Sequence, residues 1–286
     1  MVVIPRSDAC RHQGYLSLIP RHFVLDKTAK VSALLSDGTP KQYFLKCATG
    51  PSARTICEGE FHSATAISSL VPGFTPQPLG WGTYLQDDKE STKVFFLLSS
   101  FHEMDLSTPP SPTEFISRLV HLHKTSTSPT GKFGFPCPTV CGKLQRTVTW
   151  QNSWTTSFTH LLEDVIRYDN ETNGPRPDYD AACRQLIDQV IPRLLGALGD
   201  VTPTFIHGDL WENNVGIDRH TGKVIVFDAG CVYAHNEMEF GTWRCSWATH
   251  FASEPEYMLL YKERIKPSDR WRSGTIGTGC TVSILT

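Results

Sequence analysis

Three prolines in "STPPSP", between Ser107 and Pro112, divide the chain into two parts with different residue patterns. Proline fixes its own φ angle and lacks an N–H donor, so neither a helix nor a central strand runs through such a stretch. Before it, short segments of β-branched and aromatic residues predominate, and after it apolar residues recur every three or four positions. We therefore expect an α+β fold, with a small β-rich N-lobe over residues 1–103 and a mainly helical C-lobe over residues 104–286.

The pattern before the prolines predicts two hairpins and one helix. "KVSALL" and "QYFLKC" flank the turn "SDGTP", in which Asp-Gly favours a hairpin over residues 30–47. Apolar residues at helical spacing predict a helix over residues 58–70. "GWGTYL" and "KVFFLLSS" predict a second hairpin over residues 80–100. The N-lobe is therefore expected to be rich in strands, with a single helix.

Three segments after the prolines are amphipathic and predict helices. They are "EFISRLVHLHK" (114–124), "WTTSFTHLLEDVIRY" (154–168) and "CRQLIDQVIPRLLGALG" (183–199), the last with a kink expected at Pro192. A short strand pair follows, made of "NNVGID" and "KVIVFDAG" joined by "RHTG". A β-rich part followed by a helical part with its own hairpin suggests two lobes with a cleft between them.

Composition and charge exclude several kinds of partner. The 286 residues carry a net charge of −2, which gives no basic footprint for nucleic acid. No stretch has the apolar length of a membrane span, and the N-terminus lacks the pattern of a signal peptide. The nine cysteines include no CxxC pair, so free thiols in a reducing compartment are expected. We expect a cytoplasmic protein that binds neither nucleic acid nor a membrane.

The stretch His207–Gly216, "HGDLWENNVG", and the later "VFDAG" hold three residues that suit phosphoryl transfer. In that chemistry one carboxylate accepts the proton of the attacking hydroxyl, while a second carboxylate and an amide oxygen hold magnesium on the ATP phosphates. Protein kinases arrange these groups as H-R-D-L-x-x-x-N followed by D-F-G. Asp209, Asn214 and Asp228 stand at the corresponding positions. Each alone is more often a cap, a turn residue or a solvated strand end, but the three in this order favour a kinase.

The groups that bind ATP are expected upstream of this motif. Lys46 ends the strand "QYFLK", where a lysine can reach the α- and β-phosphates, and Glu60 on the following helix can pair with it. Either residue alone is usually solvated, but their order relative to the Asp209 motif supports the pair. From position alone, the hinge that meets adenine is expected around Leu97, Leu98 and Ser99.

Several segments, in order, resemble the fructosamine and ribulosamine kinases, which share the protein-kinase-like fold with aminoglycoside and choline kinases. They are "YFLK" with "EGE", then "LHKTSTSPTGKFGF", "CGKLQ", "SWTTSFT", "HGDLWENNVG" and "VFDAGCVYAHNEMEFG". "FGF" and the combination of "HGDLW" with "YAHNE" are fairly specific to this family, whereas "HGD" occurs in other small-molecule kinases. The resemblance covers residues 30–262 and is greatest to fungal members.

The resemblance implies a two-lobed protein-kinase-like fold and ATP-dependent phosphorylation of the sugar 3-hydroxyl of a ketosamine, with Mg²⁺ as cofactor. The substrate would be a ribulosamine or fructosamine adduct on lysine, in a glycated protein or a small molecule, and the unstable 3-phosphate would leave to restore the amine. The implied roles are Asp209 as base, Asn214 and Asp228 as magnesium ligands, Lys46 with Glu60 as phosphate clamp, and Trp211 as a sugar platform. A loop Trp can equally be a core anchor, so both interpretations of Trp211 stay open.

Two segments depart from the family pattern. "RHFVLD", over residues 21–26, stands where a Gly-rich loop is expected, and without glycine the backbone amides cannot approach phosphates as closely. The C-terminal "SGTIGTGCTVSILT", over residues 273–286, lacks helical periodicity. We hypothesise that the gene continues in another reading frame and that this chain has lost its last C-lobe helices. Two alternatives therefore stand beside the ketosamine kinase: an aminoglycoside- or choline-type kinase, and a catalytically impaired binding protein with a kinase fold.

Overall fold

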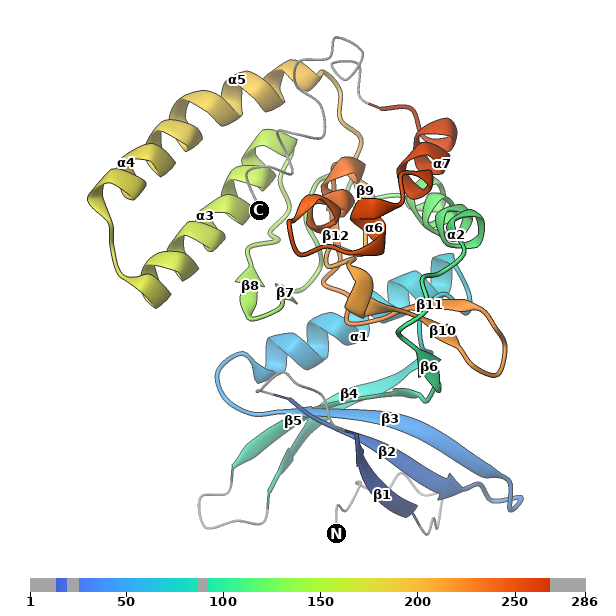
Figure 1. Ribbon diagram of the computed structural model, residues 1–286. Coiled ribbons are helices and arrows are strands. Elements are labelled where there is room, and N and C mark those ends of the chain that lie inside the picture. Colours follow the sequence, from blue (N-terminus) through green and yellow to red (C-terminus); the bar gives the residue numbers. More distant parts are fainter. Residues whose placement is uncertain (1–13, 20–25, 87–91, 268–286) are drawn as a thin grey trace.

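The computed structural model describes residues 14–19, 26–86 and 92–267. Up to Ser100 the described chain forms one five-stranded sheet with a single helix, and beyond it the chain is mainly helical with three small sheets. The expected α+β architecture of two lobes is confirmed (Figure 1). The segments at 21–25 and 273–286, for which a missing Gly-rich loop and missing helices were predicted, lie outside the described residues.

The N-lobe sheet is antiparallel and has the strand order β1–β2–β3–β5–β4. β2 and β3 form the first expected hairpin, and Asp37 holds its turn by accepting a hydrogen bond from Thr39 N at 2.9 Å. β4 and β5 form the second expected hairpin, whereas β1 is an additional strand. The strands are β1 (Gly14–Ile19), β2 (Asp26–Leu34), β3 (Pro40–Ala48), β4 (Pro78–Leu85) and β5 (Lys93–Ser100).

The helix α1 (Ala53–Leu70) lies between the N-lobe sheet and the C-lobe (Figure 1). It contains the expected helix over 58–70 and begins five residues earlier, at 53. Gly59 marks the contact with the C-lobe, because a Cβ there would stand only 2.6 Å from the Pro138 carbonyl oxygen. The helix that carries Glu60 therefore touches both lobes.

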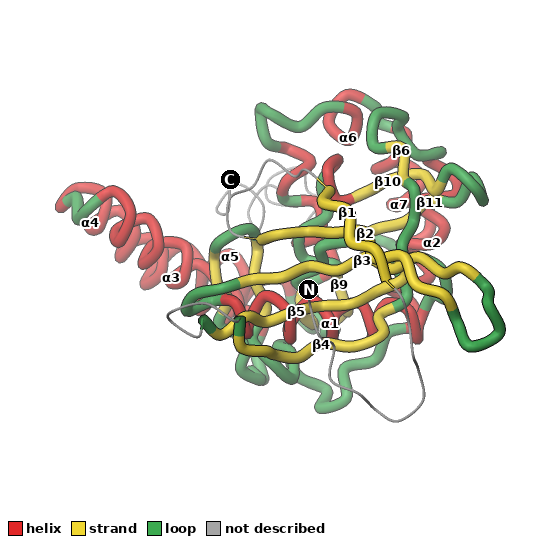
Figure 2. The backbone as a smooth tube through the Cα atoms, turned by 90° about the horizontal axis from the view of Figure 1, so that it is seen from below, coloured by secondary structure: helices red, strands yellow, loops and turns green. Residues whose placement is uncertain are grey.

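The C-lobe helices include all three that the sequence predicts. The proline-rich stretch ends where α2 begins, with Pro112 in the first turn, a position that needs no N–H donor. A π-helical turn over Leu186–Val190 separates α4 from α5 just before Pro192, where the kink was expected. Figure 2 shows α3 and α4 extending together beyond the N-lobe sheet. The helices are α2 (Pro112–Thr125), α3 (Trp154–Asn173), α4 (Pro177–Gln185), α5 (Ile191–Leu195), α6 (His250–Ser253) and α7 (Glu256–Arg264).

Three small antiparallel sheets frame the C-lobe loops. The expected hairpin is present as β10 and β11, and β6 pairs with the free edge of β10. We propose that the lobes divide between residues 103 and 104, since β6 already belongs to a C-lobe sheet. The strands are β6 (Met104–Asp105), β7 (Thr139–Cys141), β8 (Leu144–Arg146), β9 (Thr204–Ile206), β10 (Val215–Asp218), β11 (Val224–Val226) and β12 (Val232–Ala234).

The larger hydrophobic core lies in the C-lobe and is aromatic near α2. The Phe115 ring stacks on Phe251 at 5.3 Å, and Phe251 stacks on Trp243 at 4.3 Å. Aromatic rings bury a large apolar area each, so these stacked pairs stabilise the packing around α2. Within the part of the chain that the structure describes, no helix combines the length and the apolar composition of a membrane span.

Candidate active site

The loop from His207 to Asn214 connects β9 to β10 and carries the predicted base. His207 is buried, and its Nε2 lies 3.1 Å from the carbonyl oxygen of Phe227 while its Nδ1 accepts from Asp209 N at 3.3 Å. Burial lowers the pKa of this histidine, so the neutral ring donates through Nε2 and accepts through Nδ1. His207 therefore joins the Asp209 loop to the residue that precedes Asp228.

The Asp209 carboxylate is half-buried and receives two hydrogen bonds. The Asn214 amide donates to Oδ2 at 3.2 Å and to the Asp209 carbonyl oxygen at 2.8 Å. The Cys141 thiol donates to Oδ1 at 3.2 Å, and burial raises the pKa of that thiol to about 12, so it stays protonated. Because the amide nitrogen of Asn214 serves Asp209, the amide oxygen is the atom that can ligate a metal ion.

Asp228 follows β11 with a left-handed backbone. Its φ angle of 55° is the one positive value among the non-glycine residues that the structure describes. Such a conformation costs most non-glycine residues of the order of 1 kcal/mol, Asp and Asn adopt it more readily than others, and it is enriched at functional sites. The turn directs the carboxylate toward Lys46, whose Nζ lies 3.5 Å from Asp228 Oδ1.

Lys46 and Glu60 form the ion pair that the sequence predicts. Lys46 Nζ donates to Glu60 Oε2 at 2.7 Å, and both side chains are almost fully buried. Burial raises the pKa of Glu60 to about 7. The positive charge of Lys46 opposes this increase, and the negative charge of Asp228 adds to it. β3, α1 and the loop after β11 thus bring three charged groups together.

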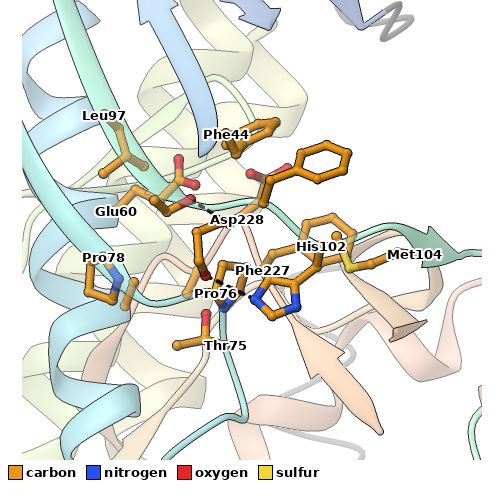
Figure 3. Close-up of a pocket in the computed structure, with 15 residues that line it drawn as sticks. Phe44, Glu60, Thr75, Pro76, Pro78, Leu97, His102, Met104, Phe227 and Asp228 are labelled. Carbon is orange, nitrogen blue, oxygen red and sulfur yellow. Dashed lines mark hydrogen bonds between the residues drawn. The ribbon is translucent and has the colours of Figure 1, made fainter. Parts of the chain in front are cut away.

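A pocket that is partly open to solvent lies beside these charges, and Glu60 and Asp228 line it (Figure 3). Leu97 and Ser99 of the predicted hinge line it, but Leu98 does not, because alternate side chains of a strand point to opposite faces. Apolar side chains cover much of the wall, as a flat aromatic ring requires. Those that the sequence had not indicated include Phe44, Pro76, Phe101, Met104 and Phe227.

His102 closes one side of the pocket and connects the two lobes. Its Nε2 lies 2.9 Å from Ser100 Oγ, and its Nδ1 lies 2.7 Å from Asp218 Oδ2. Asp218 is buried, yet hydrogen bonds from His102, Thr221 and His220 lower its pKa to about 2. Ser100, at the end of β5, is therefore linked through His102 to Asp218 at the end of β10. The sequence could have indicated Phe44 as a pocket residue, because it stands two residues before Lys46 and therefore lies on the same face of β3.

Trp211 lies beside Asp209 and is half-buried rather than central to the core. Its ring meets the half-exposed Trp247 edge-on, with centroids 5.4 Å apart and planes at 84°. The neighbours of Trp211 are both fixed: Leu210 O accepts from Trp243 Nε1 at 2.8 Å, and Glu212 Oε1 accepts from Thr249 N at 2.6 Å. Two indole rings therefore meet at a defined angle, and one of them follows the predicted base by two residues in the chain.

The oxygen donors present fit a hard divalent cation. No cluster of three or more His, Cys, Asp or Glu residues suited to a metal occurs in the described ranges. A cation held on nucleotide phosphates needs fewer protein ligands, because the phosphates and water supply the others. The amide oxygen of Asn214 and the carboxylate of Asp228 are donors of the required kind.

A sequence profile of the fructosamine kinase family matches residues 27–255. The protein-ribulosamine 3-kinase, chloroplastic, of Oryza sativa subsp. japonica is 32% identical over 138 residues, which are 48% of this chain and 38% of the rice protein. The ketosamine-3-kinase of Mus musculus is 26% identical over 216 residues, covering 68% of this chain and 67% of the mouse protein. The match thus spans about two fifths of the plant relative's length.

Solved structures share the fold. A Haemophilus somnus 129PT protein assigned to the fructosamine-3-kinases superposes with a TM-score of 0.67 at 15% identity, covering 96% of this chain and 92% of the other. The aminoglycoside phosphotransferase APH(4)-Ia superposes with a TM-score of 0.60 at 15% identity, covering 96% and 84%. The chain therefore has the two-lobed protein-kinase-like fold that the sequence predicted.

Proposed function

This chain belongs to the fructosamine kinase family, and we propose that it transfers the γ-phosphoryl group of ATP to the 3-hydroxyl of a ketosamine. The observation that carries the proposal is a chain of contacts that starts at one pocket. Glu60 and Asp228 line the pocket, and Lys46 contacts both. Asn214 donates to the Asp209 carboxylate and accepts from Phe227 N, next to Asp228, at 3.0 Å. These groups come from both lobes, and phosphoryl transfer depends mainly on positioning and charge neutralisation.

Asp209 acts as the base. Its carboxylate accepts the proton of the sugar 3-hydroxyl as the hydroxyl oxygen bonds to the γ-phosphorus, and the bond from that phosphorus to the bridging oxygen of ADP breaks. Asn214 holds the carboxylate at Oδ2. The Cys141 thiol donates a hydrogen bond to Asp209 Oδ1 at 3.2 Å, and the hydroxyl of a bound substrate would replace this donor.

Lys46 binds the α- and β-phosphates, and Glu60 keeps it in place. Asn214 and Asp228 would hold Mg²⁺, which when bound neutralises charge on the phosphates. The adenine ring fits the pocket lined by Leu97, Ser99 and the apolar side chains around them.

The acceptor lies on the Trp211 side of Asp209. Ribulosamine or fructosamine adducts on lysine, in proteins or as small molecules, are the proposed substrates. Trp211 offers its indole face to the apolar side of the sugar. Phosphorylation at the 3-hydroxyl makes the adduct unstable: the phosphate leaves by elimination, and water then cleaves the carbon–nitrogen bond. The sugar carbons leave as a dicarbonyl compound, and the amine of the glycated molecule is restored. The proposed location is the cytoplasm, although the plant relatives are named as chloroplastic.

The test is phosphoryl transfer from ATP with Mg²⁺ to ribulosyl-lysine and to fructosyl-lysine, with Asp209→Asn as the control. We expect ADP and a phosphorylated ketosamine to appear together with the wild type and neither with the variant. Mass spectrometry of the product, after mild hydrolysis, should show free lysine.

Two other outcomes would decide against the proposal. If Mg²⁺ and saturating ATP leave the melting temperature unchanged, the chain is a binding protein with a kinase fold, because a ligand that binds the native state must raise it. If ATP binds but only an aminoglycoside or choline is phosphorylated, the acceptor assignment is wrong.

A further inference from the structure

The peptide groups of Gly208, next to the proposed base, are held from two sides by buried charges. Glu239 Oε1 accepts from Gly208 N at 2.9 Å, and Arg146 Nη2 donates to Gly208 O at 2.6 Å. Glu239 is 2% exposed and Arg146 is 8% exposed. Hydrogen bonds that involve a charged partner are about twice as strong as neutral ones. The backbone just before Asp209 is therefore fixed by two strong contacts of opposite sign.

Arg146 also holds the second functional loop. Its Nη1 donates to Gly230 O at 2.8 Å, and Gly230 follows Asp228 by two residues. The two loops are in contact here, since a Cβ on Gly208 would stand 2.3 Å from Gly230 O. One guanidinium group therefore joins the loop of the base to the loop of the proposed metal ligand.

Only arginine suits both contacts at once. Its guanidinium is a rigid planar fork whose separate nitrogens can reach two carbonyl oxygens, whereas a lysine ammonium is a single point of charge. Arg146 ends β8, and the next residue is anchored, because Thr147 Oγ1 donates to Asp164 Oδ1 of α3 at 3.0 Å. The fork is thus attached to a helix outside both loops.

We propose that Arg146 is a positioning residue, which sets the separation between Asp209 and Asp228 by holding the carbonyl oxygens of Gly208 and Gly230. This role rests on the proposed function and extends it to a residue that touches neither nucleotide nor sugar. A change in that separation moves the base relative to the phosphoryl group, and a misplacement of about 1 Å costs about a hundredfold in rate.

The experiment compares Arg146→Lys with the matched control Arg118→Lys. Arg118 also donates to backbone carbonyl oxygens, of Val224 at 2.8 Å and Pro72 at 3.2 Å, but it contacts neither functional loop. We expect both variants to lose similar thermal stability. Only Arg146→Lys should lose kcat, by at least about tenfold, with KM for the ketosamine changed less than about twofold.

A second readout does not depend on turnover. Because Asp228 moves with its loop, Arg146→Lys should weaken ATP binding in the presence of Mg²⁺ several-fold and leave ATP binding without Mg²⁺ unchanged in calorimetry. If the wild type phosphorylates neither ketosamine, the proposed function fails, and this comparison still decides the role of Arg146.

Three results would overturn the positioning role. The first is an Arg146→Lys protein that keeps kcat within about twofold. The second is an Arg118→Lys protein that loses kcat equally, which would make the effect one of general stability. If Arg146→Lys does not fold, the same measurements are made on Arg146→Gln, whose side-chain amide is a neutral planar donor. The third overturning result is that neither variant folds, which would assign Arg146 to folding alone.

Discussion

The ammonium of Lys46 lies 3.5 Å from the Asp228 carboxylate, although 182 positions separate the two residues in the chain. Lys46 belongs to a strand of the N-lobe sheet and Asp228 to a loop of the C-lobe (Figure 1). A nucleotide phosphate bound there would compete with the Asp228 carboxylate for the ammonium group of Lys46. The two lobes therefore meet directly at this pair of charges.

Replacing this lysine tests the nucleotide side. Lys46→Met removes the charge that is proposed to bind the phosphates while keeping most of the volume, so we expect the Kd for ATP to rise about tenfold or more. Isothermal titration calorimetry with Mg²⁺ measures the change. Lys41→Met, on the same strand but exposed, is the control and should leave the Kd unchanged. Equal affinity in the Lys46 variant would remove Lys46 from the site.

Replacing Asp209, the proposed base, should separate chemistry from binding. Asp209→Asn keeps the shape of the side chain and the contact with Asn214 but cannot accept a proton at neutral pH. We expect kcat to fall by about a thousandfold and the Kd for ATP to change less than about twofold. Turnover near the wild-type rate would show that another group is the base.

The sequence predicted the main parts of this site because they follow local rules. Asp209, Asn214 and Asp228 stand at fixed spacing on a strand–turn–strand pattern, and the hairpin β10–β11 brings them together. Lys46 and Glu60 lie on elements with clear periodicity, and the structure joins them at 2.7 Å. Their catalytic roles stay predictions, whereas their proximity is observed.

Other parts could not be predicted because their partners lie far away in the chain, and the partners of Arg146 are backbone atoms that carry no side-chain signal. Arg146 contacts carbonyl oxygens 62 and 84 positions later, and nothing in "KLQRT" indicates such a partner. His102 and Asp218 are similarly 116 positions apart. Leu98 was placed in the hinge by position alone, and its side chain lies off the pocket because the pleat alternates.

Trp211 offers a test of the sugar side. Trp211→Leu keeps an apolar residue between the anchored neighbours Leu210 and Glu212 but removes the flat ring. We expect KM for the ketosamine to rise about tenfold while KM for ATP stays within about twofold, since stacking on an aromatic face contributes about 1 kcal/mol or more. Steady-state kinetics with each substrate varied in turn decides this. A rise confined to ATP would make Trp211 a nucleotide contact or a core anchor.

The pair of His102 and Asp218 predicts a pH-dependent loss of stability. The pKa of Asp218 is lowered from 3.8 to about 2 in the folded protein, so its ionised form stabilises the fold above pH 4 and the contribution disappears as the pH falls toward 2. The shift contributes about 2 kcal/mol to the free energy of unfolding at pH 7 and about half of that at pH 3. Urea unfolding of Asp218→Asn and the wild type at both pH values measures it.

The exposed Asp200 is the control for that measurement. Asp200→Asn should change the free energy of unfolding by less than about 0.5 kcal/mol at either pH. If the difference between Asp218→Asn and the wild type stays constant from pH 7 to pH 3, the carboxylate does not titrate as the geometry implies.

Two glycines separate the effect of backbone conformation from that of loop contact. Gly208 and Gly222 have φ angles of 79° and 69°, but an added Cβ meets Gly230 O at 2.3 Å at the first and nothing within 4 Å at the second. Gly222→Ala should therefore cost only the strain of a left-handed alanine, about 1 kcal/mol, while Gly208→Ala should cost about 3 kcal/mol or more and lower kcat. Urea unfolding and single-turnover kinetics measure both. Equal losses in the two variants would mean that the φ angle, and not the contact between the two loops, requires glycine before Asp209.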